Sequence, residues 1–224
     1  MIFSFETWQI TLFSLAVGLA STLLILPFGI VLAWLLARKE WPLKSVMETI
    51  VLLPLVMPPV SIGLILLKIF GRRSPIGQWL YEHGVEIVFN WKGVLVAMSV
   101  MSFPLLVRSV RTSFAEVNPR LEQIAATLGA SPLRIFFVVT MPLAYKGIVA
   151  GALLAFSRAL GEFGATILLA GNIPGRTQTL SLAIFNFVQT GKDSQAYVLL
   201  AITVGLAFAF VWCSECLARA GKKS

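Results

Sequence analysis

Long apolar runs, separated by short segments that carry the charges, dominate the chain. A helix needs about 20 mostly apolar residues to cross roughly 30 Å of bilayer hydrocarbon. Five segments are predicted to span a membrane on this basis: Trp8–Ala37, Ser45–Phe70, a segment that begins near Trp91, Ile135–Ala170 and Ala196–Leu217. The pattern predicts an all-α integral membrane protein with a single transmembrane domain over residues 1–224.

The second predicted span contains three prolines, Pro54, Pro58 and Pro59. Proline lacks the amide hydrogen that a helix interior needs, so these residues should interrupt the helix. Interrupted backbone at membrane depth is tolerated only against protein or a water-filled cavity. We therefore expect this break to face the inside of a helix bundle.

The segment Asn172–Gln195, between the last two predicted spans, is too polar and too marked by Gly and Pro to cross a membrane. Within it, Leu180–Val188 is apolar enough for a short re-entrant or interfacial helix. We expect this helix to dip into the membrane rather than cross it.

The composition agrees with a lipid environment, since 58% of residues are hydrophobic, 12% are charged and the mean hydropathy is +0.88. The net charge of +8 does not indicate nucleic-acid binding, because Lys and Arg are scattered among short loops. Cys213 and Cys216 have no further metal ligands near them in the sequence, so no metal site is expected.

The basic residues predict an orientation. With the C-terminus inside, ten basic residues are cytoplasmic and five are outside, which fits the positive-inside rule. The inner set is Arg38, Lys39, Lys44, Arg108, Arg111, Arg120, Arg134, Arg219, Lys222 and Lys223, and the outer set is Arg72, Arg73, Lys92, Arg176 and Lys192. A multi-pass protein of the bacterial inner membrane, with its N-terminus outside and its C-terminus cytoplasmic, is therefore expected.

One predicted cytoplasmic loop, at about 115–135, has the sequence of a short helix followed by a second helix start. Asn118 is a suitable N-cap, Pro119 fits the first helical position, Glu122 completes a capping-type spacing, and Gly129 ends the helix. Two short helices joined by a turn should form an elbow that projects into the cytoplasm.

The first helix of this elbow is amphipathic, because Leu121, Ala125 and Leu128 recur on one side at helical spacing. Small residues such as Gly129 and Ala130 allow close seating in the groove of a partner. The alternative is a loop helix that packs on the membrane ends of its own chain.

The loop contains Gln123-Ile124-Ala125, then Gly129 after three residues, then Val139-Thr140-Met141-Pro142 after nine more. This spacing resembles the coupling loop of ABC importer permeases, whose pattern is E-A-A, Gly and I-x-L-P. Gln123 and Ile124 depart from the usual Glu and Ala. In that family the loop sits in a cleft of the ATPase subunit, so the resemblance implies that the ATPase is engaged by Glu122, Gln123, Ala125, Leu128, Gly129, Ala130 and Pro142.

The fourth predicted span carries two charges, Arg158 and Glu162, four residues apart on one helical face. A charge at the centre of a lipid-facing helix costs about 2.5–3.5 kcal/mol, so the pair should face the bundle interior or a cavity. It either locks two helices together or lines the translocation path. Gly161 and Gly164 allow close helix approach, at a dimer contact or a gate. The pathway candidates are Pro58, Pro59, Arg158, Gly161, Glu162 and Gly164.

Arg158, followed by Gly161-Glu162-Phe163-Gly164, resembles permeases of the molybdate and sulfate import systems, and most specifically the bacterial molybdate permeases. Further matches are Leu53–Val60, Phe70–Arg73, Met101–Leu105 and Asn172–Gly175, spread over nearly the whole chain. Sulfate permeases usually have an additional N-terminal span, for which a start at Met1 is expected to leave no room.

The resemblance implies a type I ABC importer permease fold, a homodimer, two ATPase subunits and a periplasmic oxyanion-binding protein. Arg72, Arg73 and Arg176 are candidates for docking that binding protein. The chain has no G-x-x-x-x-G-K-[ST] loop, so ATP and Mg are expected on the ATPase, and this chain is expected to have neither a cofactor nor a catalytic residue. The alternatives are a permease for tungstate or sulfate, or an ion-coupled transporter or channel.

Overall fold

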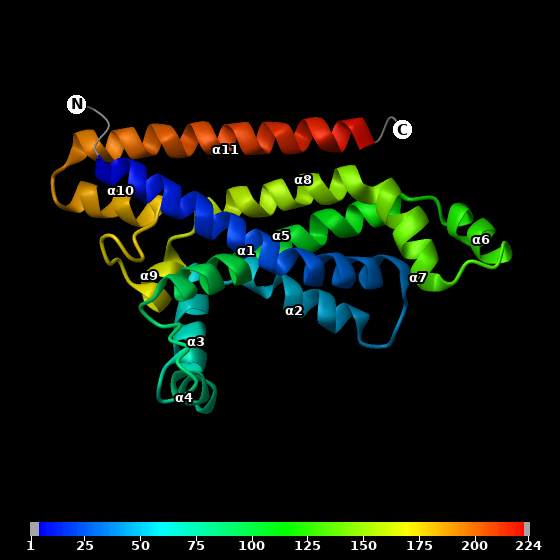
Figure 1. Ribbon diagram of the computed structural model, residues 1–224, viewed down its shortest axis with the longest axis horizontal. Coiled ribbons are helices and arrows are strands. Elements are labelled where there is room, and N and C mark those ends of the chain that lie inside the picture. The colour runs from blue at the N-terminus through cyan, green and yellow to red at the C-terminus, as the bar shows by residue number, and fades with distance from the viewer. Residues whose placement is uncertain (1–4, 222–224) are drawn as a thin grey trace.

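The structure, a computed structural model, describes residues 5–221 and is built from helices, with no strand among those residues (Figure 1). In chain order they are α1 (Phe5–Arg38), α2 (Lys44–Val56), α3 (Pro59–Phe70), α4 (Pro75–Glu82), α5 (Trp91–Glu116), α6 (Pro119–Thr127), α7 (Pro132–Ile135), the π-helix η1 (Phe136–Thr140), α8 (Met141–Leu160), α9 (Gly164–Ala170), α10 (Leu180–Gln189) and α11 (Asp193–Gly221). The predicted all-α class is confirmed. Lys222 and Lys223, two of the residues used to predict the orientation, lie outside the described residues.

Within residues 5–221, four helical segments are long and apolar enough to cross a membrane: α1, α5, the continuous run Pro132–Leu160, and α11. The pair α2 and α3 passes the same test together but is bent by 110°. The bend lies at Met57 and Pro58, as expected from Pro58 and Pro59, whereas Pro54 lies inside α2 and does not end that helix, so the expectation was wrong for Pro54. The prediction of five spans therefore holds if this bent pair is counted as one.

The fourth span was predicted to continue to Ala170, and this is wrong, because α8 ends at Leu160 and a separate helix, α9, begins at Gly164. The backbone amide of Glu162 donates to Ala159 O at 3.0 Å, a tight turn that does not continue the α-helical pattern. The Glu162 carboxylate then accepts from the Ala165 amide at 2.9 Å and so caps the new helix.

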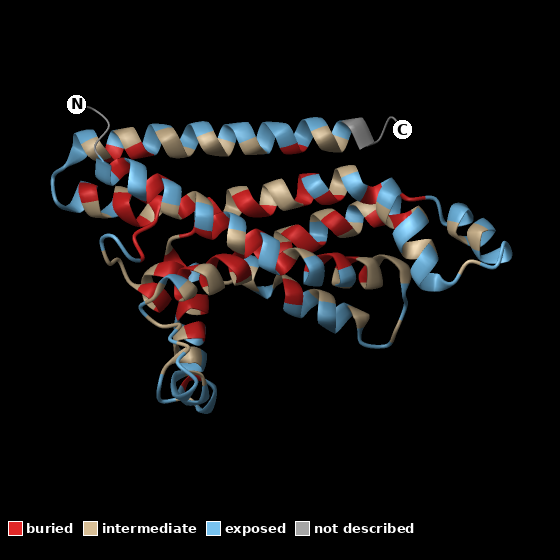
Figure 2. Cartoon of the chain, viewed as in Figure 1, coloured by how far each residue is buried: buried red, intermediate tan, exposed pale blue. Residues whose placement is uncertain are grey.

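The centre of the bundle is α5, which packs between α1 and α8 (Figure 1). The apolar window of α5 is 61% buried, whereas that of α11 is 11% buried, a contrast visible in Figure 2. Hydroxyl groups connect outer helices to the bundle. Ser14 Oγ accepts from the Leu180 amide at 2.9 Å, and Ser214 Oγ donates to Ala150 O at 2.9 Å.

The long helices run side by side, and α1 begins at the opposite end of the bundle from the end of α11 (Figure 1). The elbow formed by α6 and α7 lies at the end of the bundle where α11 ends, while α10 lies where α1 begins (Figure 1). This placement agrees with the elbow and the end of α11 on one side of a membrane. Which side is cytoplasmic stays a prediction.

Candidate functional site

The elbow helix α6 begins and ends as its sequence predicts. Asn118 Oδ1 accepts from the Arg120 amide at 3.0 Å, and Pro119 occupies the first helical position. At the other end Gly129 has φ +82°, a conformation that suits glycine, and the Ala130 amide donates to Ala125 O at 3.1 Å. A Cβ added there would meet no described atom within 4 Å, so close packing is not the reason for a glycine at this position. The reason is the positive φ that the turn requires.

Glu122 does not complete the predicted capping pair. Its Oε1 instead accepts from Thr140 Oγ1 at 2.7 Å and from Arg38 Nε at 3.2 Å, so the side chain points away from the N-cap and towards the transmembrane helices. The physical reason is that an arginine and a hydroxyl, both largely shielded from water, offer a carboxylate stronger hydrogen bonds than an exposed amide does.

A shallow cavity of about 410 Å³ separates α6 from the start of α8. The residues that line it are all apolar: Leu121, Ile124, Ala125, Leu128, Val138, Val139, Pro142 and Leu143. The two ends of the sequence motif, Ala125 on one side and Val139 with Pro142 on the other, therefore meet at one groove. Gln123 and Gly129 are exposed, and Ala130 is half-buried beside them.

The elbow projects from the bundle rather than packing on it. None of the described residues of α6 is buried, and the Leu128 side chain is 82% exposed. Glu122 nevertheless attaches α6 to its own chain, so the choice between a partner-binding helix and a loop helix packed on its own chain stays a prediction. An exposed apolar surface outside the spans is characteristic of a protein contact.

A second cavity, of about 570 Å³, lies where two helix breaks meet. Its lining consists of Pro59, Val60, Ser157, Arg158, Gly161, Glu162, Phe163 and Gly164. Five of the six pathway candidates therefore surround one space, although they come from segments almost 100 residues apart in the sequence. The sixth, Pro58, is the residue that precedes α3.

Arg158 and Glu162 form the predicted ion pair, with 2.8 Å between Nη1 and Oε2. The Glu162 side chain is 1% exposed and the Arg158 side chain is 27% exposed. Glu162 also caps α9 through the Ala165 amide. Both residues line the cavity, and Glu162 also holds the backbone of the junction, so whether the pair is structural or lines the path stays a prediction.

Of the two glycines expected to permit close approach, only Gly164 does so in the described chain. A Cβ added to Gly164 would lie 2.8 Å from Pro59 Cβ, whereas one added to Gly161 would have Arg158 O at 3.8 Å as its nearest neighbour. Gly63 on α3, which no sequence pattern marks, makes a second close contact, because an added Cβ would lie 2.9 Å from Ala165 O. The helices α3 and α9 are thus in backbone contact.

The three arginines proposed for docking a binding protein lie on two loops. Arg72 follows α3, forms an ion pair with Glu86 and lies over the Tyr81 ring at 4.0 Å from its centroid. Arg73 is exposed beside it, and Arg176 is exposed in the loop between α9 and α10. Their docking role stays a prediction.

Residues that sequence reasoning missed surround Glu122: Arg38, at the end of α1, and Thr140, in η1. Arg38 was counted only as a cytoplasmic charge, and no local signal links it to a residue 84 positions away. Among residues 5–221, no group of three or more His, Cys, Asp or Glu side chains is placed to hold a metal ion.

Comparison with known sequences gives full-length relatives. The molybdenum transport system permease protein ModB of Escherichia coli K12 is 46% identical, over 100% of this chain and 98% of the relative. The protein of the same name from Haemophilus influenzae is 45% identical over 94% of this chain and 93% of its own length. The sulfate transport system permease protein CysT of Escherichia coli K12 is more distant, at 36% identity over 81% of this chain and 67% of its own length.

Solved structures share the fold. A chain of the MetNI methionine ABC transporter, in inward-facing conformations, matches with a TM-score of 0.69 and 18% identity over 98% of this chain and 99% of that one. A chain of a bacterial alginate ABC transporter, in complex with an alginate-bound periplasmic protein, matches with a TM-score of 0.73 and 17% identity. The match covers 97% of this chain and 80% of that one. The fold is that of type I ABC importer permeases. The family model for "Binding-protein-dependent transport system inner membrane component" matches residues 8–220, and the chain belongs to this family.

Proposed function

We propose that this chain is the permease subunit of an ABC importer that carries molybdate across the bacterial inner membrane. The observation that carries the proposal is its full-length similarity to permeases named for molybdenum transport, at a higher identity than to a permease named for sulfate. The chain is a transport subunit rather than an enzyme in this account.

The working unit is a homodimer with two ATPase subunits and a periplasmic oxyanion-binding protein. A single set of spans encloses little space, and both cavities described above are open at the surface of one chain, which supports a second copy. The exposed apolar surface of α6, with Leu121, Ile124 and Leu128, supports docking to an ATPase that binds ATP and Mg. Arg72, Arg73 and Arg176 provide positive charge for docking the binding protein.

The N-terminus lies outside and the C-terminus inside in this arrangement, which places α6 in the cytoplasm beside the ATPase. ATP binding closes the two ATPase subunits and moves the two elbows together. ATP drives the change because it binds the inward-open and outward-open states with different affinity. The element that responds is the junction of the two helix breaks, where α3 and α9 touch.

The cavity at this junction suits the passage of a dianion. A pathway must attract an ion strongly enough to admit it, yet weakly enough to release it. One guanidinium per subunit, from Arg158, attracts an oxyanion, and its pairing with Glu162 reduces that attraction. A cluster of unpaired arginines would instead hold the anion in place.

Uptake by the complete complex tests this function. Proteoliposomes that contain the permease, its ATPase and its binding protein should accumulate labelled molybdate only when ATP is supplied to the ATPase side. Competition with unlabelled tungstate and sulfate ranks the three anions, and sulfate competing better than molybdate would make this a sulfate permease. Uptake driven by an ion gradient without ATP would instead identify an ion-coupled transporter or channel.

A further inference from the structure

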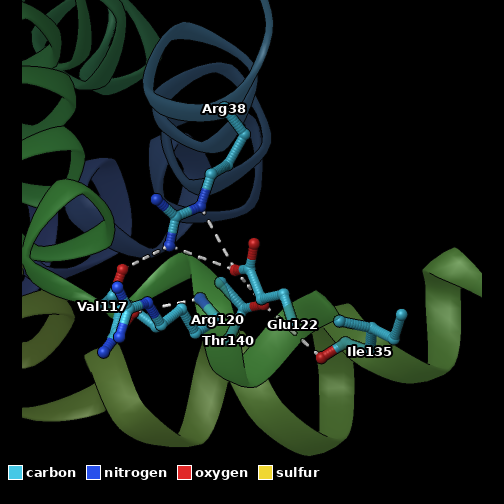
Figure 3. Close-up of polar contacts among 7 residues, drawn as sticks. Arg38, Val117, Arg120, Glu122, Ile135 and Thr140 are labelled. Atoms are coloured by element: carbon cyan, nitrogen blue, oxygen red, sulfur yellow. Dashed lines mark hydrogen bonds and ion pairs between the residues drawn. The ribbon is translucent and has the colours of Figure 1, made fainter. Parts of the chain in front are cut away.

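A polar cluster at the root of the elbow joins elements that are distant in the sequence (Figure 3). Arg38 lies in the last turn of α1, and its Nη2 donates to the Val117 carbonyl at 2.8 Å, directly after the end of α5. The same guanidinium pairs with Glu122 Oε1, at 3.2 Å from Nε and 3.1 Å from Nη2. One side chain thus connects α1, the end of α5 and α6.

Thr140 completes the cluster from the opposite side. It is the last residue of the π-helix η1, is 1% exposed, and donates its hydroxyl to the same Glu122 Oε1 at 2.7 Å. A single carboxylate oxygen therefore accepts hydrogen bonds from α1 and from the segment that leads into α8. We call Arg38, Glu122 and Thr140 the Glu122 clamp.

The clamp is shielded enough for these bonds to matter. The side chains of Arg38 and Glu122 are 13% and 19% exposed. Hydrogen bonds between charged partners are about twice as strong as those between neutral ones, and a half-buried charge that loses its partner is left poorly solvated. The clamp therefore resists separation more than an exposed ion pair would.

The π-helix is the second distinctive feature of this region. Short π-helical segments inside α-helices occur frequently at functional sites. Here η1 directs Thr140 towards Glu122, and its first residue, Phe136, packs edge-to-face against Trp34 of α1 with ring centroids 5.4 Å apart. The entry to α8 is thus fixed to α1 by a polar contact and by an aromatic one.

The elbow helix itself has no hydrophobic anchor, because none of the described residues of α6 is buried. Its apolar side chains line the open groove, whereas the Glu122 carboxylate is bound in the clamp. The part of α6 that is left for a partner and the part that is attached to the spans are therefore different side chains of one short helix.

We propose that the Glu122 clamp is the connection through which movement of α6 is passed to α1 and α8. This inference rests on the proposed function, in which an ATPase moves α6. Arg38, Glu122 and Thr140 act as positioning residues, because they keep α6 and the two spans in one rigid arrangement. Without the clamp, α6 can follow the ATPase while the spans stay behind, so ATP is hydrolysed with little transport.

The test compares transport with hydrolysis in the reconstituted complex. Glu122→Gln and Thr140→Val each remove part of the clamp, and Thr140→Ser keeps the hydroxyl. The matched control is Glu48→Gln, which breaks the ion pair between Glu48 of α2 and Arg111 of α5, 3.0 Å long and also partly shielded. Each variant is assayed for co-purification with the ATPase, for ATP hydrolysis and for molybdate transported per ATP.

Molybdate transported per ATP should fall about fivefold or more in Glu122→Gln and Thr140→Val, the low end of typical coupling between two sites, and in Thr140→Val hydrolysis and co-purification should persist. Thr140→Ser and Glu48→Gln should retain the wild-type ratio. An unchanged ratio in Thr140→Val, or an equal fall of hydrolysis and transport, would overturn the clamp proposal. If Glu122→Gln does not assemble, Thr140→Val alone decides, since it leaves every charge in place. Failure of the wild-type complex to bind an ATPase would overturn the proposed function instead.

Discussion

The contact between α3 and α9 predicts that Gly164 cannot carry a side chain without disturbing the junction. A Cβ at this position would lie 2.8 Å from Pro59 Cβ and 3.1 Å from the Val60 amide nitrogen. A proline ring and a backbone atom cannot move aside as a flexible side chain can. Overpacking of this kind costs about 1–3 kcal/mol. If that strain falls on one of the two transport states, it shifts their populations by about 5- to 150-fold.

Gly164→Ala should therefore reduce ATP-dependent molybdate uptake by about fivefold or more and lower the melting temperature of the purified protein. Gly63→Ala, whose Cβ would lie 2.9 Å from Ala165 Cα, should act in the same direction. Gly205→Ala on α11 is the matched control, because an added Cβ there would meet no described atom within 4 Å. Wild-type uptake and stability in Gly164→Ala would refute the close contact on which the junction is built.

The elbow and the ion pair give further expectations. Gly129→Leu places a side chain at φ +82°, which costs about 1–2 kcal/mol, and should reduce both ATPase co-purification and uptake, whereas Gly129→Asn should retain more of each. Leu128→Asp should leave membrane insertion and melting temperature unchanged, because Leu128 is 82% exposed, but should weaken ATPase co-purification in a pull-down; undiminished binding would contradict docking at this face. Arg158→Ala should lower the melting temperature, because it leaves the Glu162 carboxylate buried without its partner. The added change Glu162→Gln should restore part of that stability but not uptake. Recovery of uptake in the double variant would indicate a purely structural pair.

The parts of the fold that depend on local sequence could be predicted from it. The length of the apolar runs predicted the spans, and Pro58 with Pro59 predicted the break between α2 and α3. The ends of α6 were predicted by Asn118 and Gly129. Each of these features is determined by residues within a few positions of one another. The same is true of the Arg158 and Glu162 pair, which forms across one helical turn.

The features that could not be predicted depend on contacts between distant segments. A glycine inside an apolar run is usually tolerated in a helix, so Gly161 alone does not predict the end of α8. That end also depends on the Glu162 carboxylate, which caps α9. Glu122 has a plausible local partner at the N-cap, yet it is bound by Arg38, 84 residues away. Only the approach of Arg38, at the end of α1, decides between those partners.

Uptake of labelled molybdate into proteoliposomes that hold the permease with its ATPase and binding protein, with and without ATP, tests whether this chain forms the pathway of an ATP-driven molybdate importer. Accumulation should require ATP and all three proteins and should fall by about fivefold or more in Gly164→Ala. Accumulation without ATP, or accumulation of sulfate with none of molybdate, would contradict this function.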